Sequence, residues 1–358
     1  MTTMTPSKAL QAVGLSDTES HLILAGGTAP LRLDARLHTL VSLPLSEQNR
    51  ASLLDRYPSD WRAARVGDVT AWGSLAALLD GNQGHGYLYL PPLPWQQDLK
   101  DFRTLAEVVA RLRAPDGCPW DKAQTHRSVA PYLLEETYEA LETLDTGNIG
   151  ALREELGDVL LQVLLHSQIA ADEKEFTIAE VVQGLNAKLV RRHPHVLGDA
   201  TAKTAAEVAA RWEVLKSKER RGASLMTGVP KALPALAYAQ RVQERAAGVG
   251  FDWPSVDGVV EKVGEEAGEL IQAATPEERE GELGDLLFSL VNLGRRLGVD
   301  VEAALRRANE RFVGRFQTME ELSRQRGLDF ANLPLEEQDR LWEEAKARSR
   351  HAEKEGNA

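Results

Sequence analysis

The 358-residue sequence predicts a mainly α-helical protein, with two tandem helical bundle domains preceded by a small α/β region. Two observations lead to this fold class. Sequence features of residues 101–222 recur in the same order in residues 232–350, as expected of a duplicated unit. In both copies the apolar residues follow the three- and four-residue spacing of helices, and no convincing strand alternation occurs from residue 101 onward.

The composition is typical of a soluble globular protein. The 54 acidic residues outnumber the 42 basic ones, and this balance argues against general nucleic-acid binding, which needs a basic surface. The single cysteine, Cys118, excludes an intrachain disulfide framework and suits a reducing compartment. The sequence has neither an apparent secretory leader nor an apolar run of membrane-spanning length. We therefore expect a cytoplasmic protein that does not enter membranes.

Residues 1–97 differ from the rest of the chain. The segments HLILAGG (21–27) and GYLYLPPLP (86–94) predict short strands, and GSLAALLDG (73–81) has helical patterning. The segment AGGTAP lacks the spacing of a phosphate-binding loop and the helix that should follow one. The region is expected to be a small α/β unit, and its sequence indicates no function.

The internal repeat is best seen in two acidic segments. LLEETYEALE (133–142) resembles VGEEAGELIQ (263–272), and EELGD (154–158) resembles GELGD (281–285). The connection between the two segments is three residues shorter in the second copy. Ahead of them stand Trp120 in one copy and Trp253 in the other. An ordered series of matches of this kind predicts two homologous domains.

Two further patterns follow the acidic segments in each copy, N-x-[KR]-x-x-x-R and W-x-x-x-K. Their residues are Asn186, Lys188, Arg192, Trp212 and Lys216 in the first copy, and Asn309, Arg311, Arg315, Trp342 and Lys346 in the second. Residues 223–231 have linker composition, and 351–358 are expected to form a disordered tail. Each domain is predicted to be a bundle of about four helices. The nearly all-apolar stretch 156–165 is expected to be buried against a second copy.

Four pairs of carboxylates stand three residues apart on the predicted helices, where they share a face. The pairs are Glu136 with Glu139, Glu155 with Asp158, Glu266 with Glu269, and Glu282 with Asp285. An isolated E-x-x-E pattern usually marks a solvated helix face. Here, however, the last pair begins a polar stripe that continues through Ser289 and Asn292 on an otherwise apolar helix. The stripe therefore predicts that the helix faces something polar, and packing of the two helices would bring four carboxylates together.

A cluster of four carboxylates needs protons or cations. One like-charge contact at about 4 Å costs roughly 4 kcal/mol at an effective dielectric near 20. Oxygen-only ligands favour Mg²⁺, or else Mn²⁺. No histidine follows a glutamate by three residues, so the Glu-x-x-His pattern of di-iron bundles is absent.

The second repeated set complements a metal. Arg311, Arg315 and Lys346 could form a local cationic patch for phosphate oxygens, while Trp253 and Trp342 could stack on a base. Ordinary surface charge and ordinary tryptophan packing are the alternatives. Carboxylates for a metal and cations for phosphate together predict a site for a nucleotide polyphosphate.

From about residue 101 to 350 the chain resembles the MazG-type nucleoside triphosphate pyrophosphohydrolases. The resemblance rests on RLRAPDGCPWDKAQTH, APYLLEETYEALE, LREELGDVLLQV, KLVRRHPHV, VGFDW, ELGDLLFSLVNL and ANERF. It implies tandem all-α domains that form homodimers, bind Mg²⁺ and cleave NTPs or dNTPs between the α and β phosphates. The expected role is housekeeping of the nucleotide pool.

The resemblance also implies roles for residues, with the activity in the C-terminal copy. The metal would be held by Glu266, Glu269, Glu282 and Asp285, and the nucleotide by Asn309, Arg311, Arg315, Trp342 and Lys346. The catalytic group is Glu265, Glu266, Glu282 and Asp285, with Glu265 or Glu266 as the base. The second candidate sets are Glu136, Glu139, Glu155 and Asp158 for metal, and Asn186, Lys188, Arg192, Trp212 and Lys216 for nucleotide. Arg311 stands where the family commonly has lysine.

Three alternative functions stay open on the sequence alone. A pyrophosphohydrolase specialised for dNTPs, or one for phosphoribosyl-ATP, would share the bundle and the metal. A non-catalytic helical bundle that regulates a partner would need no intact carboxylates.

Overall fold

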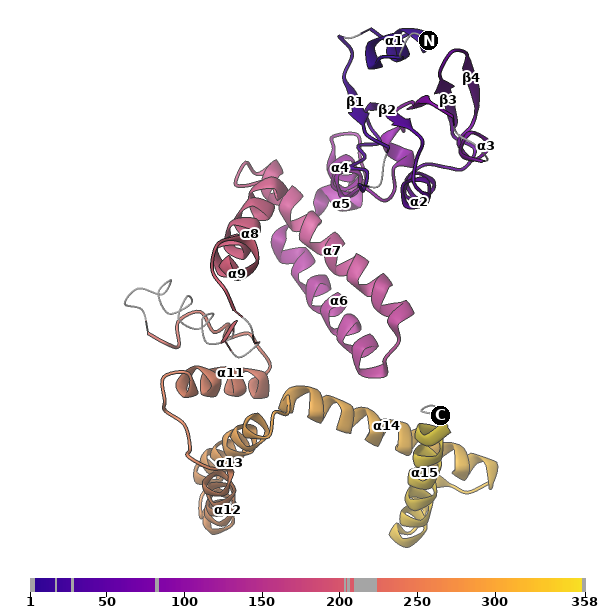
Figure 1. Ribbon diagram of the computed structural model, residues 1–358. Helices are drawn as coiled ribbons and strands as arrows, with labels where there is room; N and C mark the ends of the chain where they lie inside the picture. The colour runs from indigo at the N-terminus through magenta and orange to yellow at the C-terminus, as the bar shows by residue number, and fades with distance from the viewer. Residues whose placement is uncertain are drawn as a thin grey trace. The chain divides into compact units, whose positions relative to one another are not determined.

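A computed structural model describes residues 4–16, 18–26, 29–80, 84–202, 204, 207–208 and 224–355 (Figure 1). It confirms a mainly α-helical chain with a small N-terminal sheet region. By its internal contacts the chain divides into two compact units, one of Met1–Ala140 with Gly150–Gly184 and the other of Leu141–Ile149 with Leu185–Ala358. None of the described helices combines the length and apolar character needed to cross a bilayer.

The N-terminal region contains a mixed five-stranded sheet of order β1-β2-β5-β3-β4. Strands β1 and β2 are parallel, and the other neighbouring pairs are antiparallel. The strands are β1 (His21–Leu24), β2 (His38–Leu43), β3 (Arg62–Val66), β4 (Thr70–Ser74) and β5 (Gly86–Leu90); the helices are α1 (Pro6–Ala12), α2 (Glu47–Arg56), α3 (Leu75–Leu79) and the 3₁₀ turn η1 (Trp95–Gln97). The two predicted strands and the predicted helical segment are confirmed as β1, β5 and α3.

Both faces of this sheet are covered, because successive strand residues point to opposite sides. On β2, Leu40 belongs to a buried cluster with Leu10 of α1, whereas the next residue, Val41, belongs to a cluster with Leu53 of α2. Leu88 of β5 lies in the second of these clusters as well. The region therefore has two small cores, one on each face.

Charged side chains fasten the sheet region to α4 (Phe102–Arg113). Arg103 donates two hydrogen bonds to Asp34, of 3.0 and 2.9 Å, and a third of 2.9 Å to Asp101. Asp101 also accepts the backbone N–H of Arg103 as the cap of α4, and Arg56 donates to it at 2.7 Å. These contacts hold the pKa of Asp101 well below its usual range, chiefly through the Arg103 hydrogen bond.

The first helical copy is built around a long antiparallel hairpin. After α4 come α5 (Pro119–Ala123), α6 (His126–Thr146), α7 (Ile149–Asp172), α8 (Ile178–Arg192) and α9 (Pro194–Leu197). Val109 of α4 and Val129 of α6 are buried with Leu164, Leu165 and Ile169 of α7. This cluster places one end of α7 against α4 and the start of α6.

The second copy repeats the hairpin. Its helices are α11 (Ala235–Ala247), α12 (Val256–Gln272), α13 (Pro276–Arg296), α14 (Val301–Gln325) and α15 (Leu335–Glu355), with the 3₁₀ turn η2 (Phe330–Asn332). Thr275 and Glu278 form a reciprocal capping box that starts α13 right after α12. Residues 224–231 of the predicted linker form no helix or strand, and α15 extends five residues past the predicted boundary at 350. As expected, the described residues from 101 onward include no strand.

Candidate metal and nucleotide site

Three carboxylates converge on the second hairpin. Glu266 and Glu269 come from α12 and Glu282 from α13, and one ligand oxygen from each lies within 4.8 Å of the others. The capping box fixes where α13 starts, which sets the position of Glu282 opposite the two α12 residues. Three carboxylates at this separation could hold a hard divalent cation.

The electrostatics of this cluster are those of crowded negative charge. Glu266 is only 5% exposed, and Lys262 Nζ lies 2.7 Å from its carboxylate. The pKa of Glu282 is raised, first by loss of solvent and then by the charges of Glu269, Glu266 and Asp285. A cation bound here would relieve the repulsion that raises this pKa.

Asp285 and Glu265 lie beside this cluster. Asp285 contributes charge to Glu282, but it is outside the group of three whose ligand atoms converge. Glu265 is exposed and pairs with Lys262 at 3.0 Å. Lys262 thus bridges two neighbouring carboxylates, and the structure places Glu265 where it remains open to water.

The first hairpin holds a matching cluster of Glu136, Glu155 and Asp158, again with ligand atoms within 4.8 Å. The pKa of Glu136 is raised by loss of solvent first and then by a hydrogen bond with Glu139. Glu139 itself lies outside the converging three. When Glu136 is aligned with Glu266, Tyr132 takes the position of Lys262. The first copy therefore has an aromatic side chain at the position where the second copy has Lys262.

A cavity of about 650 Å³ opens beside α13 in the second copy. Its lining is mostly apolar and aromatic, and comprises Met226, Val242, Gln243, Ala246, Gly250, Phe251, Asp252, Trp253, Pro254, Phe288, Asn292 and Arg295. Trp253 lies against Gly258 of α12, where a Cβ atom would come within 2.9 Å of its ring. Such a mixture of aromatic rings and a few amides is typical of a pocket for a flat ligand.

The polar groups of the cavity are held by neighbours. Gln243, 6% exposed, donates from Nε2 to the Phe288 carbonyl at 2.8 Å, while its buried Oε1 has no partner among the described residues. Asn292 Oδ1 accepts a 2.7 Å hydrogen bond from Arg295, which also pairs with Asp252. The Gln243 oxygen is thus a buried acceptor in the wall of the cavity.

The first copy has a buried leucine at the position that corresponds to Asn292. When Glu155 is aligned with Glu282, Leu165 takes the position of Asn292. Leu165 is 5% exposed and packs in the apolar cluster with Val109 and Val129. The row of polar residues on α7 therefore ends before this position. On α13 the corresponding row continues to Asn292, which lines the cavity.

The predicted nucleotide-binding residues of the second copy lie on α14 and α15. The Arg315 guanidinium lies 5.7 Å from the centre of the Trp342 ring, which also contacts Phe312. Lys346 pairs with Glu343 at 3.0 Å. Asn309 and Arg311 are exposed. In the part of the chain that the structure describes, the cations of this set form no ion pair with the α12 and α13 carboxylates. The prediction that they form a cationic patch for phosphate stays a prediction.

The candidate residues of the first copy are less well defined. Asn186, Lys188 and Arg192 lie on α8. Trp212 and Lys216 fall outside the described residues. Sequence reasoning did not find Gln243, Phe251 or Phe288 as candidate site residues, although the neighbouring Trp253 was a candidate for base stacking. The repeated G-x-x-W segment was the available signal, because it recurs with its tryptophan in both copies.

Comparisons with known proteins agree with these two helical copies. A model of the MazG nucleotide pyrophosphohydrolase domain matches residues 124–197, and a model of phosphoribosyl-ATP pyrophosphohydrolase matches residues 239–312. The chain is similar to the nucleoside triphosphate pyrophosphohydrolase/pyrophosphatase MazG of Thermotoga maritima, with 49% identity over 247 residues, which cover 68% of this chain and 95% of the relative.

Two other relatives extend the comparison. The nucleoside triphosphate pyrophosphohydrolase of Escherichia coli K12 is 44% identical over 251 residues, again 68% of this chain and 95% of the relative. The protein YabN of Bacillus subtilis is 40% identical over 351 residues, which cover 92% of this chain and 71% of the relative. That match must extend into the N-terminal sheet region. On its two family matches and these identities, the chain belongs to the MazG family of nucleotide pyrophosphohydrolases.

Proposed function

We propose that this protein is a Mg²⁺-dependent nucleoside triphosphate pyrophosphohydrolase. It would cleave NTPs or dNTPs between the α and β phosphates and release the monophosphate and pyrophosphate. Its relatives from Thermotoga maritima and Escherichia coli are named for nucleoside triphosphate pyrophosphohydrolase activity. We further propose that it acts in the cytoplasm and that its role is the housekeeping of the nucleotide pool.

One observation supports this proposal most strongly: a single helix joins the carboxylate cluster to the cavity. Glu282 belongs to the cluster, while Phe288 and Asn292 of the same helix line the cavity. At 1.5 Å per residue these two lie about 9 and 15 Å along α13 from Glu282. A nucleotide could therefore place its base in the cavity and its phosphates toward the carboxylates.

The carboxylate cluster fits Mg²⁺, with Mn²⁺ as the alternative. Its ligands are all oxygens, and loss of solvent together with the neighbouring carboxylates raises the pKa of Glu282. Glu266, Glu269 and Glu282 would hold the ion, with Asp285 close enough to join them. When bound, Mg²⁺ supplies charge neutralisation for the triphosphate and lowers the pKa of a coordinated water.

The protein's own side chains would do the remaining work. Glu265, exposed at the edge of the cluster, would accept the proton of the attacking water, and Glu266 is the alternative base. Arg315 and Lys346 would bind phosphate oxygens and stabilise the charge that develops on them. Trp253 and Phe251, which line the cavity, would hold the base.

We assign the activity to the C-terminal copy. Its carboxylates are joined to an open cavity, whereas the matching position in the first copy holds the buried Leu165. The first copy keeps Glu136, Glu155 and Asp158 close together and could bind a cation. With the buried Leu165 at the position of Asn292, it would serve structure or dimerisation.

We also propose that the protein is a homodimer. Leu283, Leu287 and Leu290 of α13 are 47%, 44% and 41% exposed, and they follow the three- and four-residue spacing of one helix face. Phe312 and Val313 of α14 are more than half exposed. A second copy of the chain would cover these apolar surfaces and form larger helical bundles.

A specialised substrate is the second candidate. The match of residues 239–312 to phosphoribosyl-ATP pyrophosphohydrolase covers α12, α13 and most of the cavity lining. Phosphoribosyl-ATP shares the adenine and triphosphate groups, so the same constellation could accept it. Preference between this substrate and ordinary NTPs or dNTPs is best measured by kcat/KM.

The proposal is tested by product analysis with the eight common NTPs and dNTPs and phosphoribosyl-ATP in the presence of Mg²⁺. We expect pyrophosphate and the corresponding monophosphate; release of orthophosphate would overturn the reaction. Glu282→Gln should lower kcat by a factor of at least 100, whereas Glu155→Gln should leave most activity. The reverse pattern would move the active site to the first copy.

The dimer is tested separately by light scattering on eluted protein. Leu287→Glu should shift the chain from dimer to monomer, because it places a charge on the apolar face of α13. Val69→Glu is the matched control, since Val69 is 80% exposed in the N-terminal sheet region. A wild-type monomer would contradict the proposal.

A further inference from the structure

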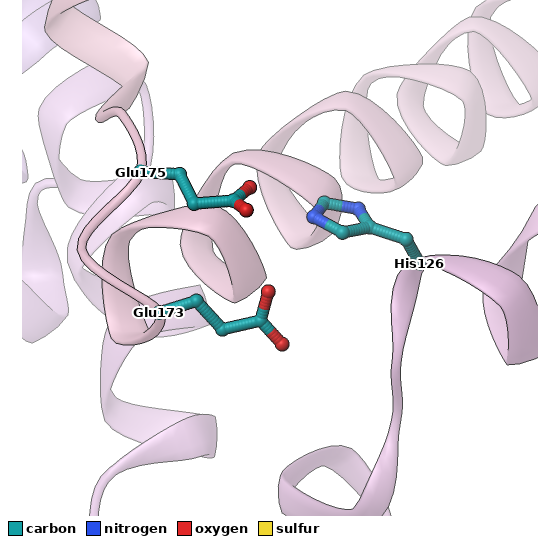
Figure 2. Close-up of side chains that lie close together, drawn as sticks. All are labelled: His126, Glu173 and Glu175. Atoms are coloured by element: carbon teal, nitrogen blue, oxygen red, sulfur yellow. The ribbon is translucent and has the colours of Figure 1, made fainter.

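A second kind of ligand cluster lies at the far end of α7 from Glu155 and Asp158. His126 begins α6, and Glu173 and Glu175 stand directly after α7; one ligand atom from each lies within 4.8 Å of the others. Figure 2 shows both carboxylates directed toward the imidazole. Glu173 lies about 22 Å from Asp158 along the axis of α7, so this cluster is separate from the carboxylate cluster of the same copy.

The backbone explains why two glutamates on either side of one residue face the same way. Lys174, between them, has φ 63°, in the left-handed region that glycine usually occupies at this position. Glu175 N donates to Ala170 O and Lys174 N to Ala171 O, which together close the end of α7. The chain thus reverses at Lys174 and brings the side chains of Glu173 and Glu175 to one side.

The charge at this turn is unbalanced. The C-terminal end of a helix carries partial negative charge, so carboxylates are unfavourable there. Within the part of the chain that the structure describes, neither Glu173 nor Glu175 forms a side-chain hydrogen bond or ion pair. A cation would balance both carboxylates and the end of α7 together.

The imidazole of His126 is held in place by a second histidine. Its Nδ1 lies 2.8 Å from Nδ1 of His166, and the two rings stack with centroids 5.1 Å apart and planes at 11°. His126 Nε2 is therefore the nitrogen that remains for a ligand. Metal-binding histidines are commonly oriented by such a partner.

We propose that His126, Glu173 and Glu175 bind a first-row transition metal ion, for which Zn²⁺ is the best fit. One imidazole nitrogen and two carboxylates suit Zn²⁺ better than Mg²⁺, which prefers oxygen alone. Ligands about 2.0–2.1 Å from a tetrahedral ion lie roughly 3.4 Å apart. The exposed glutamates can close the small remaining gap by changing rotamer, and water completes the coordination.

The ion joins two segments that are distant in sequence. His126 lies at the start of α6, and the glutamates lie in the turn between α7 and α8. Its binding fixes the ends of the first hairpin against each other and stabilises this copy. This role is independent of nucleotide hydrolysis and does not rest on the proposed function.

The experiment titrates Zn²⁺ into the full chain in excess Mg²⁺, which occupies the carboxylate clusters, and counts bound ions by calorimetry. We expect one Zn²⁺ per chain in the wild type. Glu175→Gln and His126→Gln should weaken its affinity more than 100-fold, because each removes a direct ligand. Glu142→Gln on α6 and the exposed His85→Ala are matched controls that should bind as the wild type does. Zn²⁺ binding that Mg²⁺ abolishes, or that both variants retain, would overturn the proposal.

A second set of measurements tests whether His166 orients His126, and whether the loss of Zn²⁺ binding in Glu175→Gln comes from a lost ligand and not from misfolding. His166→Phe keeps a ring at this position but removes the hydrogen bond, and loss of such an outer partner typically weakens metal affinity about 10–100-fold. Zn²⁺ should raise the Tm of the wild type and of the controls but not that of Glu175→Gln. Because Glu175 is exposed, its variant should fold normally, so an equal rise in its Tm would also contradict the assignment.

Discussion

Lys262 Nζ lies 2.7 Å from the carboxylate of Glu266, one helical turn along α12, and 3.0 Å from that of Glu265. These contacts raise the pKa of Lys262, so the cation persists over the whole physiological range. A Mg²⁺ ion on Glu266 must compete with this cation. The first copy has Tyr132, which carries no positive charge, at the corresponding position.

We therefore predict opposite effects of Lys262→Gln on metal binding and on metal-free stability. The apparent Mg²⁺ affinity should rise about fivefold, as expected from removing one partly exposed positive charge beside the ligands. Without metal, the protein should lose about 1–3 kcal/mol because the buried Glu266 loses its partner. Calorimetry with Mg²⁺ and urea unfolding in a chelator measure the two effects.

The exposed Lys231→Gln is the control for a simple change of net charge. It should change neither the Mg²⁺ affinity nor the stability without metal. If Lys262→Gln instead weakened Mg²⁺ binding, Lys262 would be arranging the carboxylates for the metal rather than competing with it.

The contacts of Asp101 predict how stability depends on pH. Its folded pKa is depressed, chiefly by Arg103, and that of Asp34 is depressed by the same guanidinium. A depressed carboxyl pKa stabilises the fold fully above the unfolded value of about 3.9, and this contribution is lost as the pH falls toward the folded pKa. Acid unfolding should therefore begin below about pH 5.

Asp101→Asn tests this assignment, because asparagine can still cap α4 while the charge is gone. At pH 7 we expect a loss of about 1–3 kcal/mol in the free energy of unfolding. The difference from the wild type should shrink as the pH falls toward 3. Asp116→Asn is the comparison, since its partner Arg111 and Asp116 itself are both exposed. A difference that stayed constant with pH would assign the effect to capping alone.

Trp253 and Trp120 provide a matched pair for the base pocket. Trp253 lines the cavity of the second copy, whereas Trp120 is 54% exposed in the first and contacts Tyr132. Stacking on a base contributes about 1–3 kcal/mol, so Trp253→Ala should raise KM roughly tenfold or more. Trp120→Ala should leave KM unchanged. Equal effects of the two variants on steady-state kinetics would rule out Trp253 as the stacking residue.

The carboxylate hairpins could be predicted from the sequence because their geometry is local. Helical periodicity places Glu266 and Glu269 on one face, and a short capped turn returns the chain so that Glu282 meets them. Sequence reasoning expected four ligands in each cluster. The structure brings three together in each cluster and leaves Asp285 and Glu139 outside the converging sets.

Features that depend on distant contacts could not be predicted. Strands β3 and β4, RAARV and TAWGS, have weak strand patterning, and their pairing with each other and of β3 with β5 supplies what their sequences lack. The cavity depends on Gln243 of α11 meeting Phe288 of α13, which lies 45 residues later. No local pattern specifies such a contact.

Asn292 and Leu165 occupy matching positions in the two copies, and exchanging their chemistry tests which copy is active. Asn292→Leu replaces the last polar residue of the row on α13 with the apolar side chain that Leu165 provides on α7. We expect kcat/KM to fall about 10–100-fold, as for the loss of one or two hydrogen bonds to a ligand, with the Tm little changed.

The reciprocal change, Leu165→Asn, places an amide in the apolar cluster around Val109 and should cost about 2–4 kcal/mol in stability. Per folded molecule its kcat/KM should equal that of the wild type. If Leu165→Asn lowered kcat/KM per folded molecule while Asn292→Leu did not, substrate would bind in the first copy, and the cavity beside α13 would need another ligand.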